Sequence, residues 1–148
     1  MKLIKPSFEV LEQAPGLTGV YKQIEIAGRT CYKSEDKITE TSAKEFIERM
    51  VKSGHGAMLE HGTVYLKIQS DIVNEGNCNL DLFTDGNPYS RWYIKDGYWY
   101  VTTNFRVLIE QHEIDLLQYI CEPTEYHEKR VSVKFICDRG VSHKKFVA

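Results

Sequence analysis

The segment around Asp96-Gly97 constrains the fold most, because it predicts an antiparallel pair of strands at a fixed place in the chain. Residues 90–94 and 98–102 are rich in aromatic and β-branched side chains, and they flank the short turn Lys95-Asp96-Gly97. An Asp-Gly pair between two such runs is one of the strongest local signals of a β-hairpin. We therefore expect at least part of the sheet to be antiparallel.

Further strands are predicted on both sides of this hairpin. Residues 3–11, 63–68 and 131–137 contain apolar residues that alternate with polar ones, which is typical of strands with one buried face. Residues 71–90 are polar and rich in turn-forming residues, so we expect an exposed excursion there.

Residues 42–53 form the clearest predicted helix. Ser42 and Glu45 make a Ser-x-x-Glu capping box at its start, and Gly54 occupies the position where a left-handed residue is favoured after a helix. Other helices are expected from Leu17 to about Tyr32, ending near Arg29, and then over residues 104–109, with Asn104 as the cap, and 114–120. Helices and a hairpin together predict an α+β fold, with a mixed, partly antiparallel sheet flanked by helices.

Bulk properties restrict the class of protein. A chain of 148 residues is most simply a single domain, 1–148, and its formal net charge of -2 gives no general attraction to nucleic acid or to a membrane surface. The N-terminus lacks the apolar core of a signal peptide, and no apolar run is long enough to cross a bilayer, so we expect a cytoplasmic protein. The four cysteines are widely spaced, which favours reduced thiols over disulfides or a zinc site.

A polar segment after the predicted helix contains the first candidate site residues, His55, Glu60 and His61. The two histidines are six residues apart in a glycine-containing loop, which is not the spacing of a zinc-binding helix. One interpretation is a loop that contacts a ligand from the end of a helix. The alternative, favoured by composition alone, is that Glu60 and His61 only begin a strand.

Arg139 is the second candidate, because Arg139-Gly140 follows a predicted strand. A guanidinium and backbone N–H groups at such a position can bind a phosphate. The alternative is a solvated basic tail. The aromatic residues of the hairpin are expected to pack across strands rather than to bind nucleic acid, and no residue is assigned as catalytic from the sequence pattern.

Three segments together resemble flavin-dependent thymidylate synthases. They are Arg29-Thr30-Cys31-Tyr32, then residues 54–65 with His55, Glu60 and His61, and then residues 135–143 with Cys137-Asp138-Arg139-Gly140. In this order they are similar to the N-terminal half of that family, in a variant with an insertion that matches about residues 71–130.

The resemblance implies a thymidylate-synthase-complementing-protein-like fold and a homo-oligomer with sites shared between subunits. It implies FAD as cofactor and dUMP as substrate. The family methyltransferase reaction is the reductive methylation of dUMP to dTMP with methylenetetrahydrofolate and NADPH. It also implies that His55, Glu60 and His61 face the flavin and that Arg139 lies at the dUMP site.

One motif of the family is absent from these 148 residues. The signature Arg-His-Arg, which normally follows the segment matching Ser142-His143, occurs nowhere in the sequence. We therefore expect a truncated relative that is inactive as it stands. The alternatives are an oligomerisation or regulatory partner, and an α+β binding module without catalysis.

Overall fold

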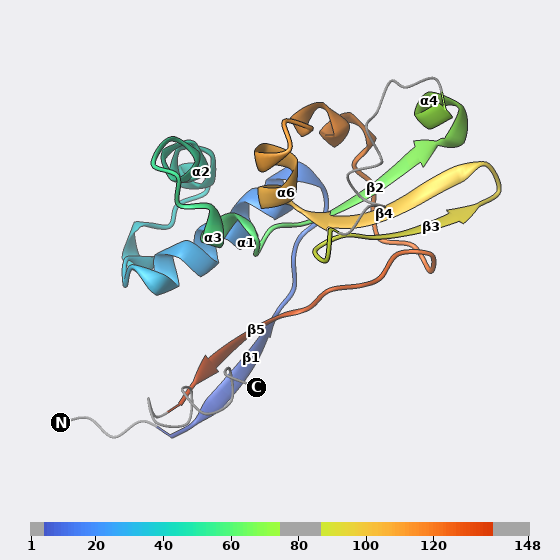
Figure 1. The fold of residues 1–148 in the computed structure, drawn as a ribbon. Coiled ribbons are helices and arrows are strands. Elements are labelled where there is room, and N and C mark those ends of the chain that lie inside the picture. Colours follow the sequence, from blue (N-terminus) through green and yellow to red (C-terminus); the bar gives the residue numbers. More distant parts are fainter. Residues whose placement is uncertain (1–4, 75–86, 138–148) are drawn as a thin grey trace. The chain divides into compact units, whose positions relative to one another are not determined.

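The computed structural model describes residues 5–74 and 87–137, and it confirms the α+β class (Figure 1). Within the described residues every pair of strands is antiparallel. The chain forms two compact units, one with residues 1–12 and 131–148 and the other with residues 13–130. The single-domain organisation stays a prediction, and each unit is treated separately below.

The smaller unit contains a two-stranded antiparallel ribbon of β1 (Ser7–Leu11) and β5 (Ser132–Ile136). Both strands were expected, although residues 3 and 4 of the predicted 3–11 strand lie outside the described residues. Phe8 pairs with Phe135 and Val10 with Val133, so one face of the ribbon is apolar. All four of these side chains are at least 38% exposed.

The larger unit contains a three-stranded sheet in the order β2-β4-β3. Its strands are β2 (Thr63–Gln69), β3 (Arg91–Lys95) and β4 (Tyr98–Asn104). Lys95 pairs with Tyr98, and the two residues between them have positive φ values, 49° at Asp96 and 76° at Gly97. This is the backbone of a two-residue hairpin turn, and the predicted hairpin is confirmed.

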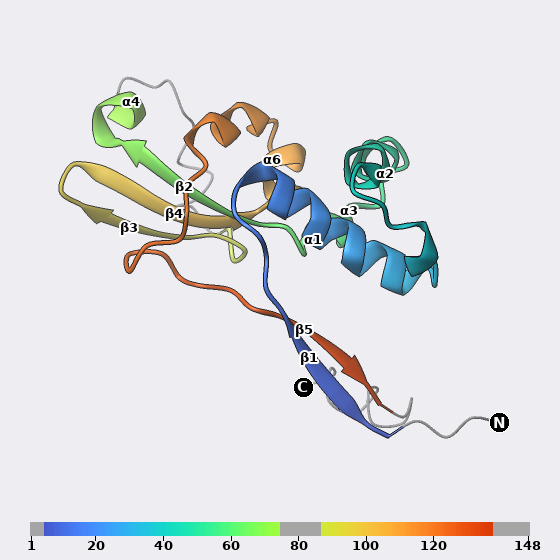
Figure 2. The same ribbon diagram turned by 180° about the vertical axis from the view of Figure 1, so that it is seen from behind.

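Strands β2 and β4 and several helices form the core. Helix α1 (Gly16–Cys31) and helix α6 (Phe105–Glu110), which follows directly from β4, pack on these strands. In Figures 1 and 2, α1, α2 (Ser42–Lys52) and α3 (Gly56–Leu59) lie together at the end of the sheet where β2 begins. The completely buried aliphatic residues are Ile24, Val64, Leu66, Ile68, Val101 and Leu108.

The predicted helix over residues 42–53 is confirmed, but the capping box at its start is wrong. The N-cap residue is Thr41, and its side chain makes no capping hydrogen bond. The Ser42 hydroxyl instead donates to the carboxylate of Glu25 at 2.9 Å. Because Glu25 is 1% exposed, its oxygens need donors inside the protein, and Ser42 is one of them. Gly54 has a φ of 70°, as its position after the helix predicted.

Several short elements were not predicted. The segment over residues 54–61 was expected to be a loop, yet it contains α3, a helix of four residues. A 3₁₀ turn, η1 (Glu35–Lys37), joins α1 to α2, and α4 (Ser70–Asn74) extends β2 into the predicted excursion. The helix expected over 114–120 is the 3₁₀ helix η2 (Ile114–Tyr119).

Asn104 caps α6 as expected, since its side-chain oxygen accepts a hydrogen bond from the Val107 amide at 3.0 Å.

His127 anchors the segment that follows η2 to the sheet. Its ring is 6% exposed, Nδ1 accepts a hydrogen bond from the Thr124 amide at 3.0 Å, and Nε2 lies 3.1 Å from the Leu66 carbonyl oxygen. Because Nδ1 acts as an acceptor, the proton is on Nε2, which donates to Leu66. Burial lowers the pKa of His127, so the ring is held in its neutral form.

None of the helices within residues 5–74 and 87–137 is long and apolar enough to cross a membrane.

Candidate functional site

The three candidate residues of the 55–61 segment lie at the two ends of α3. His55 is the N-cap residue, Glu60 is the C-cap residue, and His61 follows it. All three side chains are exposed. The four-residue helix therefore sets the spacing between them, which a loop would leave variable.

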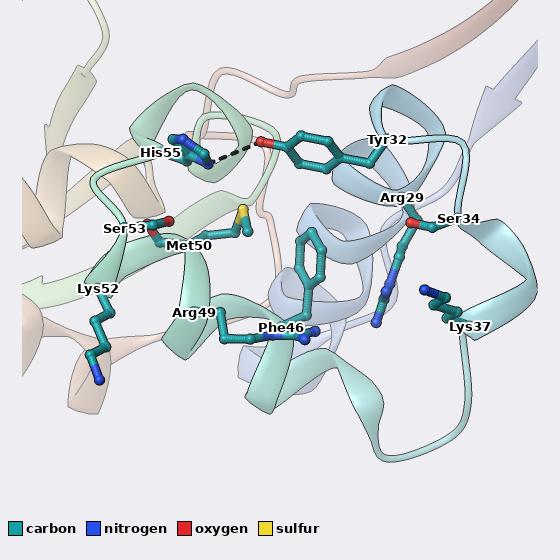
Figure 3. A pocket seen from close by; sticks show the side chains of 10 residues that line it. All are labelled: Arg29, Tyr32, Ser34, Lys37, Phe46, Arg49, Met50, Lys52, Ser53 and His55. Carbon is teal, nitrogen blue, oxygen red and sulfur yellow. Dashed lines mark hydrogen bonds between the residues drawn. The ribbon is translucent and has the colours of Figure 1, made fainter.

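His55 is held by Tyr32, which lies just beyond the end of α1. The Tyr32 hydroxyl and Nδ1 of His55 share a hydrogen bond of 3.0 Å (Figure 3). The two rings are stacked, with centroids 6.3 Å apart and an interplanar angle of 28°. Together they form an exposed pair of aromatic rings that carries polar atoms, which suits contact with a planar heterocycle.

Glu60 is already engaged within the protein. Arg106 on α6 binds its carboxylate and also donates to Glu110 at 2.7 Å. The pKa of Arg106 is raised, first by the hydrogen bond to Glu110 and then by the one to Glu60. Arg106 lies 46 residues away from Glu60 in the chain, so no local pattern could predict this contact.

The other two candidates make fewer described contacts. The backbone amide of His61 donates to the Met58 carbonyl at 3.2 Å, which closes the last turn of α3, and its side chain is exposed. Arg139 lies outside the described residues, and its role stays a prediction.

Next to the Tyr32–His55 pair is an open pocket of about 740 Å³. Residues from the end of α1, from η1, from α2 and from the α2–α3 junction line it (Figure 3). We call it the basic pocket, because four of its lining residues are Lys or Arg and none is Asp or Glu. Its lining is Arg29, Tyr32, Ser34, Lys37, Phe46, Arg49, Met50, Lys52, Ser53 and His55.

Arg29 forms the inner wall of the basic pocket. Its side chain is 9% exposed, and its Nη2 lies 3.1 Å from the carboxylate of Glu25, one helical turn earlier. The guanidinium also stacks on Phe46, with its central carbon 4.8 Å from the ring centroid. Such a contact holds a cation in place through the negative face of the ring.

Most of the basic pocket was missed by the sequence analysis. The sequence pattern indicated Arg29 only as the end of a helix and as part of the segment Arg29-Thr30-Cys31-Tyr32, and it did not indicate Lys37, Arg49 or Lys52. The one local signal was the Glu25–Arg29 spacing, which favours an ion pair within a helix. The remaining cations come from separate elements, so their approach depends on the packing of α1 against α2.

These residues partly fit FAD, the cofactor that the resemblance implies. The Tyr32–His55 surface suits a flat ring, and the adjacent cations suit an anionic group. Glu60 does not offer a free carboxylate here, because Arg106 binds it. Among the described residues no cluster of three or more His, Cys, Asp or Glu side chains could hold a metal ion.

The cysteines within the described residues are unpaired. Cys31 and Cys137 are exposed, and Cys121 is half-buried. Burial raises the pKa of the Cys121 thiol, which disfavours the reactive thiolate. Cys78 lies outside the described residues.

Comparison with known proteins gives one family for part of the chain. Residues 16–74 match the family model of Thy1, the thymidylate synthase complementing protein. This segment runs from the start of α1 to the end of α4, so it includes His55, Glu60, His61 and the whole lining of the basic pocket. Searches of curated proteins and of solved structures gave no match. The resemblance is therefore confirmed over this segment: residues 16–74 carry a domain of the flavin-dependent thymidylate synthase family, Thy1.

Proposed function

We propose that residues 16–74 provide the flavin-facing part of a thymidylate synthase site of the FAD-dependent type. The observation that carries the proposal is the stacked Tyr32–His55 pair, which lies inside the Thy1 segment and borders an open pocket. We assign residues of about 71–130 to an insertion in the family fold, since the match ends at residue 74.

In this proposal His55 presents its ring to the flavin, and Tyr32 fixes the orientation of that ring. Glu60 and His61 supply polar contacts from the other end of α3, and Arg106 determines how far Glu60 can reach. FAD, when bound, supplies the redox chemistry of the family. Arg139 is assigned to the phosphate of dUMP.

We further propose that the 148-residue polypeptide does not methylate dUMP by itself. The family reaction is the reductive methylation of dUMP with methylenetetrahydrofolate and NADPH. Recognition of a phosphate and a pyrimidine depends on several charge-assisted hydrogen bonds, each contributing about 1.5–3 kcal/mol. Without an Arg-His-Arg motif, too few of these bonds remain for useful affinity or for positioning of the substrate.

Quenching of flavin fluorescence tests the binding part of the proposal. We expect saturable FAD binding, and we expect His55→Ala to raise the dissociation constant at least about tenfold, because the stacking surface is lost. His112→Asn is the matched control, since His112 is exposed on the turn after α6, away from the Thy1 segment. Absence of FAD binding, or equal weakening by both variants, would contradict the proposal.

An assay of dUMP-dependent flavin oxidation with methylenetetrahydrofolate tests the second part. We expect no turnover above the background without dUMP. Measurable dTMP formation by the purified polypeptide would overturn the assignment of inactivity.

A second candidate function is an oligomerisation or regulatory partner. The observation that favours it is the exposed apolar face of the β1–β5 ribbon, where Phe8 is 71% and Val10 is 52% exposed. Exposed apolar patches of this kind often mark protein interfaces. Light scattering on the purified chain tests it, and a monomer over the accessible concentration range would contradict it.

A further inference from the structure

We propose that His127 is a pH-dependent switch, which holds residues 120–130 against the outer edge of β2 while its ring is neutral and releases them when the ring is protonated. We call residues 120–130 the edge segment. The proposal rests on the position of one imidazole ring between this segment and the sheet, with a hydrogen bond at each ring nitrogen. None of these contacts involves His55, Glu60 or His61, so the inference does not rest on the proposed function.

The edge segment closes the side of β2 that no described strand occupies. Among the described strands, β2 pairs only with β4. On its other side Ile120 forms an isolated antiparallel bridge with Leu66, and the Cys121 amide donates to the Tyr65 carbonyl at 2.9 Å. The Arg130 amide donates to the Tyr65 hydroxyl at 3.1 Å. An irregular segment therefore takes the place of a further strand.

The His127 ring connects the edge segment to the sheet. Nδ1 lies 3.0 Å from the amide and 3.0 Å from the hydroxyl of Thr124, within the segment. Nε2 lies 3.1 Å from the Leu66 carbonyl oxygen on β2. The ring also packs at steep angles on Tyr65 and Tyr100, with 5.4 Å between the ring centroids in each pair. A neutral ring with its proton on Nε2 satisfies both hydrogen bonds to the backbone.

Protonation of the ring removes the acceptor at Nδ1, because both nitrogens of an imidazolium ion are donors. The Thr124 hydroxyl can turn and accept, but the Thr124 amide can only donate. Two N–H groups then point at each other inside the protein, and the amide loses its acceptor. The turn that brings Thr124 onto the ring is therefore incompatible with the charged form of His127.

No anion among the described residues offsets a positive charge on this ring. The groups that face it are the Cys121 thiol, with Sγ 3.9 Å from Nε2, and the rings of Tyr65 and Tyr100. Lys67 adds a second cation, since its Nζ lies 5.6 Å from the centroid of the Tyr100 ring. The carboxylates of the edge segment are exposed and form no ion pair with His127; they are Glu122, Glu125 and Glu128. Burial accordingly lowers the pKa of His127.

The side-chain contacts beyond His127 that hold the later part of the edge segment are at least partly exposed. Tyr126 stacks on Tyr93, which is 50% exposed, and Glu128 lies 3.6 Å from Arg91 in an exposed ion pair. Such a pair contributes little. Neither the β2–β4 nor the β3–β4 ladder involves the edge segment, so the sheet keeps its pairing when the segment leaves. The release leaves unpaired backbone groups along the outer edge of β2.

Hydrogen exchange of single amides in the full chain, measured between about pH 5.5 and pH 7.5, tests the switch. The Cys121, Thr124 and Arg130 amides report on the edge segment, and the amides of the central strand β4 report on the sheet. We expect the segment to open with a lower free energy and a weaker dependence on urea than β4, because its opening exposes less surface. After correction for intrinsic exchange rates, its protection should fall several-fold on acidification. The upper limit is about tenfold for a histidine whose pKa rises to about 6.5 on release.

His127→Gln removes the titrating ring, and His112→Asn, at an exposed position after α6, is the matched control. The control should keep the pH dependence, whereas in His127→Gln the protection of the edge segment should no longer fall with pH. A segment that is unprotected at every pH in His127→Gln, with β4 still protected, also supports the proposal, since the ring is then what holds it. Equal opening free energies for the segment and β4 in the unaltered chain, or an unchanged pH dependence in His127→Gln, would overturn the proposal.

Discussion

Arg29 and Arg106 each bind a glutamate one helical turn away, but their surroundings differ. In the Arg29–Glu25 pair the side chains are 9% and 1% exposed, whereas in the Arg106–Glu110 pair they are 36% and 52% exposed. Removal of one partner leaves a buried charge in the first pair and a hydrated charge in the second. The same residue types at the same spacing therefore contribute differently to the free energy of unfolding.

We predict that Arg29→Met lowers the free energy of unfolding by about 3–5 kcal/mol, because it leaves Glu25 buried and charged. Arg106→Met should lower it much less, since Arg106 and its partners are exposed. Urea denaturation followed by circular dichroism measures both. Similar losses in the two variants would show that Glu25 reaches solvent when Arg29 is absent.

His127 gives the fold a dependence on pH. An unfolded histidine titrates near pH 6.5, and burial lowers the pKa of His127 in the folded protein. Below about pH 6.5 the unfolded state therefore binds more protons than the folded state, and the free energy of unfolding decreases as the pH falls toward the lowered pKa. Above about pH 6.5 this contribution is fully present.

Urea midpoints measured between about pH 5 and pH 8 test this prediction. We expect the midpoint to fall on acidification in the unaltered chain and in His112→Asn, and to fall less in His127→Gln, which has no titrating ring at this position. A slope that is unchanged in His127→Gln would assign the pH dependence to other groups.

Helices α1 and α2 approach each other closely because α1 has a glycine at the contact. A Cβ atom on Gly28 would lie 2.5 Å from the tip of the Phe46 ring, and Phe46 is itself 3% exposed. The same ring lies beneath Arg29 and Arg49 in the basic pocket. The distance between the two helices therefore determines both the packing of this region and the position of its cations.

We predict that Gly28→Ala destabilises the chain by about 1–3 kcal/mol, despite the better helix propensity of alanine, because the buried ring has to move. A second substitution, Phe46→Leu, should make the added methyl group less costly. A double-mutant cycle by thermal or urea unfolding measures the coupling. Additive effects of the two substitutions would contradict the proposed contact.

Local patterns predicted most elements of this fold. The Asp96-Gly97 hairpin, the helix predicted over 42–53 and the Asn104 cap each depend on residues that are neighbours in the sequence, and each is confirmed. The predicted capping box is wrong because the Ser42 hydroxyl donates instead to Glu25, a residue of another helix. Helix α3 was missed because four residues with a glycine show no helical period.

In the candidate site, too, local features were predicted and contacts between distant segments were not. The 55–61 segment was identified because its residues are consecutive, but the contacts that orient it were not. Tyr32 is 23 residues from His55, and Arg106 is 46 residues from Glu60. A local sequence pattern cannot predict such contacts, because they depend on how separate helices pack against each other.

At the scale of the whole molecule, the buried core belongs to residues 13–130. The other unit contributes a two-stranded ribbon, and an isolated ribbon of this kind is marginally stable in water. We predict that a polypeptide of residues 13–130 folds cooperatively without the ribbon. A sigmoidal thermal transition and a dispersed amide spectrum would agree with this, and a non-cooperative transition would show that the ribbon is needed for folding.

The pairing of β2 with β4 has a consequence for how this protein can be divided. Strand β2 is the last strand of the Thy1 segment, yet its ladder partner over residues 98–104 lies beyond that segment. A transplant of residues 16–74 into another protein would carry an edge with unpaired backbone groups and an uncovered apolar face. The segment that matches the family model is thus smaller than the smallest segment expected to fold independently. Any chimaera has to include the β3–β4 hairpin that completes the sheet.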